Sequence, residues 1–93
     1  MGLLKAMHRR SWKNAVSDEF FNQHGIRFRA LADIIGRATL DDLLNDEYQR
    51  VPRSPTVAAA NLARVLNRSF GINLPLLAMR SKIDSLGWDR EAS

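Results

Sequence analysis

The chain has 93 residues, of which 45% are hydrophobic and 26% are charged, and it contains no cysteine. A chain of this length is expected to form one small domain, because domains typically span about 50 to 250 residues. The absence of cysteine excludes disulfides and cysteine-ligated metal sites. The formal net charge of +4 is typical of proteins that bind nucleic acids or acidic surfaces.

The positive charge is concentrated near the N-terminus. Residues 1–14 contain four basic side chains and no acidic one, whereas residues 15–93 contain ten basic and ten acidic side chains, which cancel. The basic residues of the first segment are Lys5, Arg9, Arg10 and Lys13.

The residue spacing predicts an amphipathic helix from about residue 3 to 22. Every fourth residue from 4 to 20 lies on the same side of such a helix. The residues at this spacing are Leu4, His8, Trp12, Val16 and Phe20. We therefore divide the chain into a basic amphipathic helix at residues 1–22 and a helical domain at residues 23–93. Two alternatives stay open for the helix: it docks on a membrane surface or a partner through its four basic residues, or it packs its apolar stripe on the domain.

Helical signals continue along the next part of the chain. Apolar spacing predicts a second helix over residues 28–36, which ends at a glycine. Thr39 and Asp42 form a pattern close to a capping box and predict a short turn of helix. Two prolines predict an ordered loop over residues 48–55, since proline lacks the amide donor that a helix needs.

The strongest helical segment spans residues 56–70 and is closed by Gly71. A proline then predicts a short helical turn over residues 76–79, and Asp84 or Ser85 is placed to cap a last helix. No stretch alternates with the period of a strand. The predicted fold is an all-α bundle of four to five helices that includes the N-terminal amphipathic helix.

The sequence offers no pattern for catalysis or metal binding. His8 and His24 are not at ligand spacing, and the acidic residues of 41–47 lack the order of a calcium loop, so they are expected to be solvated. No serine lies in a Gly-x-Ser-x-Gly motif, and no glycine-rich phosphate cradle is present. We expect no enzyme, no metal and no catalytic residue. Without a signal peptide or about 20 consecutive apolar residues, we also expect a cytoplasmic protein with no transmembrane segment.

A helix-turn-helix DNA-binding protein is an alternative, because arginines gather at and along the helix 56–70. The motif fits residues 31–36, but the following recognition helix would carry the acids of 41–47, which repel phosphates. It also fits residues 62–68, but Pro75 then falls within the second helix.

From Leu31 onward, the order of elements resembles an acyl or peptidyl carrier protein of fatty-acid, polyketide or nonribosomal-peptide synthesis. The match is sequential: residues 31–36 resemble the end of the family's first helix, 40–53 its long loop, 57–67 its second helix and 82–86 the entry to its fourth. The most specific part is Ser69-Phe70-Gly71-Ile72-Asn73-Leu74-Pro75-Leu76, which resembles the sequence that closes the second helix and opens the short third one.

The family attaches phosphopantetheine to the serine of an Asp-Ser-Leu motif at the start of its second helix. The matching triplet here is Pro55-Thr56-Val57, so Thr56 stands at the serine position, and Ser54 is a nearby hydroxyl. The resemblance therefore implies a non-catalytic carrier-like domain that holds no cofactor and acts by protein docking, with a biosynthetic enzyme as the partner. An active carrier that bears phosphopantetheine on an atypical serine is the alternative.

The family's second helix is usually acidic, whereas the matching helix here is basic. We therefore expect the partner-binding face on this helix and the loop before it, with arginines pairing with carboxylates of the partner. The residues predicted for this face are Arg53, Thr56, Val57, Arg64 and Arg68.

Overall fold

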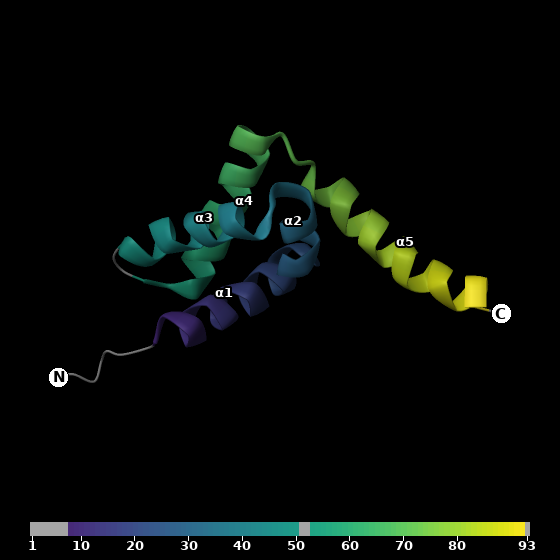
Figure 1. Ribbon diagram of the computed structural model, residues 1–93, viewed down its shortest axis with the longest axis horizontal. Coiled ribbons are helices and arrows are strands. Elements are labelled where there is room, and N and C mark those ends of the chain that lie inside the picture. Colours follow the sequence, from purple (N-terminus) through teal and green to yellow (C-terminus); the bar gives the residue numbers. More distant parts are fainter. Residues whose placement is uncertain (1–7, 51–52, 93) are drawn as a thin grey trace.

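The computed structural model describes the backbone of residues 8–50 and 53–92, and the side chains of residues 8–50 and 53–83. In these ranges the chain forms five α-helices and no strand (Figure 1). The all-α class is thereby confirmed. The helices are α1 (Arg9–His24), α2 (Phe28–Ile35), α3 (Arg37–Gln49), α4 (Pro55–Phe70) and α5 (Leu74–Ala92).

Helices α1 and α4 pack against each other and form the centre of the molecule. α1 turns Trp12, Val16 and Phe20 inward, and none of the three is more than 1% exposed. The facing side of α4 includes three alanines, whose small side chains let the two helix backbones come close. The buried residues of α4 are Ala58, Ala59, Leu62, Ala63 and Leu66.

Helices α2 and α3 cover another side of this core. α2 contributes Leu31, and α3 contributes Leu40 and Leu44. The two helices are joined by the single residue Gly36, whose φ of 94° and ψ of 143° lie where only glycine is comfortable. The amide of Gly36 closes α2 on the carbonyl of Ala32, and its own carbonyl accepts the first hydrogen bond of α3.

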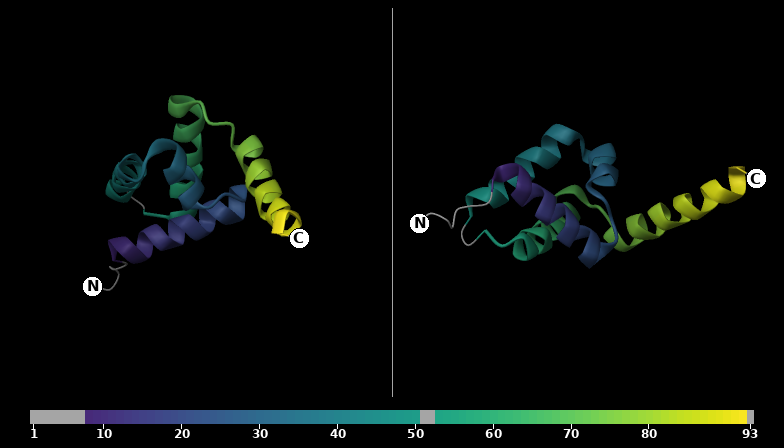
Figure 2. Two further views of the ribbon diagram at one scale, coloured as in Figure 1. Left: turned by 45° about the vertical axis from the view of Figure 1, so that its right-hand side comes forward. Right: turned by 90° about the horizontal axis from the view of Figure 1, so that it is seen from below.

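Helix α5 joins this body only through its first turns and then projects away from it (Figures 1 and 2). Leu74 is buried, and Leu77 and Ala78 pack against the core from one side of the helix. The projection gives the molecule extents of 55 × 27 × 21 Å. In the described part of the chain, no helix has both the length and the hydropathy that crossing a bilayer requires.

Of the predicted first helix, residues 3–7 lie outside the described ranges; His8 is extended with ψ of 155°, and α1 runs from Arg9 to His24. The predicted start of α3 is wrong. α3 is not a short turn that begins at Thr39 but a helix of 13 residues that begins at Arg37. Its N-cap is Gly36, whose positive φ lets the chain leave α2 and enter α3 without a loop.

The predicted break between a short helix at 76–79 and a last helix from Asp84 or Ser85 is also wrong, since α5 is continuous over 19 residues. Its start is fixed by Asn73, whose side-chain oxygen accepts a hydrogen bond from the amide of Leu76 at 3.0 Å. Pro75 lies in the first turn, where its missing N–H has no helical partner to lose.

The predictions for α2 and α4 are confirmed. α2 ends before the expected glycine, and α4 begins one residue earlier than expected, at Pro55, and ends at Phe70. Gly71 follows with φ of 65°, which is the left-handed conformation that commonly ends helices. Of the predicted loop, residues 48–49 belong to α3 instead, while residues 53–54 are non-helical.

The two glycines that end α2 and α4 predict different stability losses. We expect Gly71→Ala to lower the free energy of unfolding by about 1 kcal/mol, since Ala enters the left-handed region at a modest cost. Gly36→Ala is expected to cost about 2–3 kcal/mol, because its backbone conformation is nearly restricted to glycine. Urea unfolding followed by circular dichroism measures both. Equal losses at the two positions would contradict the conformation described at Gly36.

His24, the last residue of α1, predicts a pH dependence of stability. Its ring lies 4.8 Å from the ring of Phe20, its Nε2 is buried without a hydrogen-bond partner, and this burial lowers the pKa of His24 below its usual 6.5. The unfolded chain therefore binds the proton more tightly, so the free energy of unfolding falls as the pH drops from 8 toward 5.5. Denaturant unfolding across this range measures it.

The control for this prediction is the other histidine, His8, which is exposed before α1. His24→Gln is expected to flatten the decline in stability between pH 8 and 5.5, while His8→Gln leaves it in place. An unchanged decline in the His24 variant would show that other groups cause it.

Candidate functional site

Four exposed residues of α4 lie on one stripe of its surface. Val57, Ala60, Arg64 and Arg68 are spaced by three, four and four residues, which places them on the same side of a helix. All four are exposed, and Val57 keeps 51% of its surface in solvent. We call these four residues the α4 stripe. The structure thus brings together three of the residues that the sequence predicted for a docking face.

The two arginines of the stripe are free of salt bridges. Among the described residues, the only ion pairs join Lys13 to Asp41 and Arg50 to Glu47. Arg64 and Arg68 also make no side-chain hydrogen bond within the described part of the chain. Their guanidinium groups are therefore available to pair with carboxylates of another molecule.

Arg53, predicted for the same face, is held by its own domain. Its Nε donates a hydrogen bond to the carbonyl oxygen of Tyr48 at 2.7 Å, and its guanidinium lies 4.3 Å from the centre of the Tyr48 ring. Its carbonyl oxygen accepts the indole N–H of the buried Trp12 at 3.0 Å. Arg53 thus fixes the loop before α4 as well as contributing positive charge beside the stripe.

A groove of about 460 Å³ opens between the end of α3 and the start of α4. Arg53, Ser54 and Val57 line it together with Glu47 and Asn61. The Glu47 carboxylate is only 7% exposed, and it accepts a hydrogen bond from Asn61 Nδ2 at 3.3 Å. Glu47 also pairs with Arg50, whose Nε lies 3.4 Å from Glu47 Oε2. The carboxylate is therefore already compensated, and with Arg53 the charged side chains that line the groove carry a net positive charge.

The two hydroxyls that the carrier resemblance singled out differ in their surroundings. Ser54 is the N-cap of α4, and its Oγ accepts a hydrogen bond from the amide of Val57 at 3.3 Å. Thr56 is exposed in the first turn of α4, and its carbonyl oxygen accepts a hydrogen bond from Gln23 at 3.1 Å. Thr56 lies off the α4 stripe, one residue before Val57.

Of the basic residues predicted for N-terminal docking, two contact side chains of α3. Arg9 lies over the Tyr48 ring at 5.0 Å, Lys13 pairs with Asp41, and Arg10 is exposed. Lys5 lies outside the described residues. Because the apolar face of α1 is buried on α4, the structure favours packing over docking for this helix.

No catalytic or metal-binding arrangement is found in the described part of the chain. There, no group of three or more histidine or carboxylate side chains is placed to hold a metal ion. In the acidic cluster of α3, Asp41, Asp42 and Asp46 are exposed, whereas Glu47 turns into the core side.

No family model, no curated protein and no solved structure matches this chain.

The cluster of Trp12, Tyr48 and Arg53, which positions the loop before α4, was not predicted from the sequence. Trp12 and Tyr48 meet edge to face with ring centroids 5.2 Å apart, although they are far apart in the sequence. The sequence shows only that an arginine follows a tyrosine after five residues. This spacing does not reveal that both residues contact Trp12, because that contact forms only when α1 packs against α3 and α4.

The different settings of Arg53 and Arg64 predict different effects on stability. We expect Arg53→Ala to lower the free energy of unfolding by about 1–2 kcal/mol, because it removes a hydrogen bond and a cation–π contact. Arg64→Ala is expected to change it by less than about 0.5 kcal/mol, since its side chain is exposed. Urea unfolding measures both, and the two variants serve as controls for each other. A larger loss at Arg64 than at Arg53 would contradict this assignment.

Proposed function

We propose that this chain is a non-catalytic docking domain that binds an acidic surface of a partner protein through the α4 stripe. The observation that supports the proposal is the alignment of Arg64 and Arg68 with the exposed Val57, on a helix whose opposite face is fixed in the core. A rigid helix loses little backbone entropy on binding, so the entropic cost is mainly that of ordering the two arginine side chains, which charge-assisted hydrogen bonds to carboxylates offset. The apolar Val57 adds a contact that excludes water.

We further propose that the partner is a biosynthetic enzyme of a fatty-acid, polyketide or nonribosomal-peptide assembly. This part rests on the resemblance of residues 69–76 to carrier proteins. Two elements depart from that resemblance: residues 40–49 are helical where the family has a long loop, and α5 is one helix where the family has two. The proposal therefore keeps the docking role and assigns no prosthetic group.

We predict that this chain carries no prosthetic group. The alternative is an active carrier that bears phosphopantetheine on a serine. We expect no phosphopantetheine on incubation with coenzyme A and a broad-specificity phosphopantetheinyl transferase, because Thr56 stands at the serine position and the Ser54 hydroxyl caps α4. Intact-mass spectrometry measures the modification. A Thr56→Ser variant tests whether a serine at this position is sufficient for attachment of phosphopantetheine. A mass gain on any serine of the unaltered chain would establish an active carrier instead.

DNA binding remains the alternative from another class. Pro75 does not block a second helix as the sequence suggested, because α4 and α5 are joined by the three residues 71–73. However, the exposed part of the first half of α5 carries Leu76, Met79 and Ile83, which are more than half exposed, beside the exposed cations Arg80 and Lys82. The three apolar side chains offer no hydrogen bonds to base edges, and the two cations are suited to phosphates, which carry no sequence information. The α2–α3 pair is also disfavoured as a DNA-binding motif, because the exposed carboxylates of α3 repel phosphates.

The docking proposal predicts that charge reversal on the stripe abolishes partner binding without unfolding the domain. A photoreactive amino acid in place of Ala60, on the stripe, is expected to crosslink the partner in cells, while one in place of Asn14, on the exposed side of α1, is not. The partner identified by mass spectrometry is then purified and titrated calorimetrically. We expect Arg64→Glu with Arg68→Glu to weaken its binding by at least about tenfold.

The matched control is Arg10→Glu, which changes an exposed arginine of α1 and should leave the affinity nearly unchanged. Equal crosslinking from both positions, or an unchanged affinity in the double variant, would contradict the proposal. Titration with duplex DNA at several salt concentrations completes the test. Binding that strengthens as salt falls and disappears in the double variant would make the chain a nucleic-acid-binding protein instead.

A further inference from the structure

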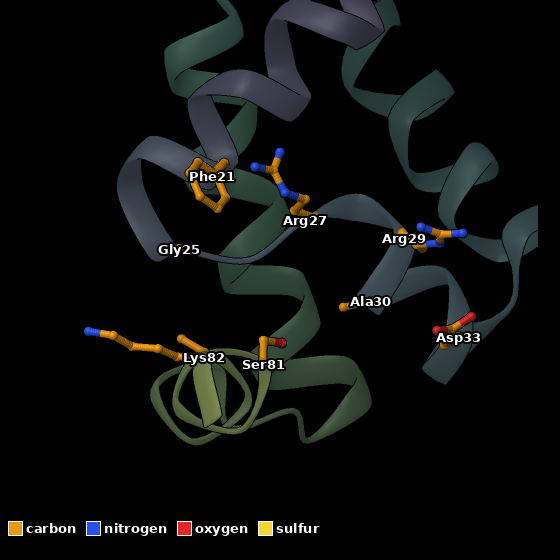
Figure 3. Close-up of a pocket in the computed structure, with 9 residues that line it drawn as sticks. Phe21, Gly25, Arg27, Arg29, Ala30, Asp33, Ser81 and Lys82 are labelled. Atoms are coloured by element: carbon orange, nitrogen blue, oxygen red, sulfur yellow. The ribbon is translucent and has the colours of Figure 1, made fainter. Parts of the chain in front are cut away.

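A second groove, of about 640 Å³, lies between the C-terminal end of α1, helix α2 and the first half of α5 (Figure 3). The groove exists because α5 packs on the core only through its first turns, at Leu74 and Leu77. Beyond these residues, α5 diverges from the body, and α2 does not cover it. None of the residues predicted from the sequence for partner binding lines this groove. It is therefore separate from the α4 stripe.

The groove has an apolar floor. Ala30 of α2 and Ala78 of α5 line it with short side chains, and both are half-buried. Phe21 of α1 lines one end and keeps 39% of its surface exposed. Helical spacing places Ile34, which is 52% exposed, on the same side of α2 as Ala30. A partner that covers this floor removes apolar surface from water, which favours binding.

The rim of the groove is basic. Figure 3 shows Arg27, Arg29 and Lys82 around the opening, with Asp33 as the one carboxylate among the residues that line it. None of the three cations forms an ion pair with another residue in the described part of the chain. Arg27 instead lies over the Phe21 ring at 4.2 Å, which holds its guanidinium at the edge of the apolar floor.

We propose that this groove binds an acidic amphipathic helix of a partner protein. An amphipathic helix fits because its apolar stripe matches the floor between α2 and α5, as in other helix-in-groove complexes. An acidic one fits because the residues that line the groove include three exposed cations and only one carboxylate. The undescribed N-terminal residues 1–7 of the chain do not have this character, since they contain Lys5 and no acidic residue.

The probe for the experiment is a synthetic peptide of about four helical turns with leucines at helical spacing on one side and glutamates beside them. It is titrated into the full-length ¹⁵N-labelled protein and followed by NMR. We expect saturable shifts of the amide signals of Arg27, Ala30, Asp33, Ala78 and Lys82. A peptide with lysines in place of the glutamates is expected to bind at least about tenfold more weakly.

Variants locate the binding surface. Arg29→Glu with Lys82→Glu is expected to weaken binding of the acidic peptide by at least about tenfold, because two rim cations become carboxylates. The matched control Arg37→Glu reverses an exposed arginine of α3 outside the groove, and its affinity should change less than about twofold. Arg64→Glu with Arg68→Glu should also leave peptide binding intact, which separates this proposal from the one for the α4 stripe.

Three outcomes would overturn the proposal. The first is that the peptide causes no shifts in the groove or shifts the α4 stripe instead. The second is equal binding of the acidic and basic peptides. The third is that sedimentation shows a dimer of the free protein whose groove signals change on dilution, since the occupant would then be a second copy of this chain.

Discussion

The arrangement of the helices depends on the burial of one side chain, Trp12. The ring is 1% exposed, and its indole N–H donates to the carbonyl oxygen of Arg53, so the polar atom of the largest core residue is satisfied without water. Its edge-to-face contact with Tyr48 ties α1 to the end of α3. One side chain therefore joins α1, α3 and the loop that leads into α4.

The contacts among Trp12, Tyr48 and Arg53 determine which side of α4 is exposed to solvent. Because Arg53 is fastened to Tyr48 and to Trp12, the start of α4 is anchored, and the Ser54 cap then sets the direction of the helix. The alanines of α4 bring it close to α1, which leaves only one side of α4 in solvent. The arginines on that side are consequently positioned by the core rather than by contacts of their own.

The sequence predicted α4 well, because a helix of 16 residues with an apolar period and a glycine stop contains its own boundaries. Of the residues predicted for its docking face, Val57, Arg64 and Arg68 share one side of the helix, whereas Thr56 does not. The prediction failed for α3 and α5, for different reasons. At α3, the pattern at Thr39 suggested a start, but Gly36 adopts a conformation that lets the helix begin earlier, and composition does not encode that conformation. At α5, Asp84 and Ser85 resemble cap residues, yet the helix runs through them, because neither residue lacks the amide donor or the backbone conformation that a helix interior needs.

The distribution of charge is the reason why we propose protein partners rather than a nucleic acid for the two surfaces. α3 packs on α4, so the exposed carboxylates of Asp42 and Asp46 belong to the helix next to the α4 stripe. Negative charge on a neighbouring helix weakens the attraction of the α4 stripe for a phosphate backbone. A partner helix, with a diameter of about 10 Å, can contact α4 alone. At the second groove, Arg27, Arg29 and Lys82 surround an apolar floor. Apolar contact stabilises an amphipathic helix there, whereas a phosphate chain has no apolar surface to bury.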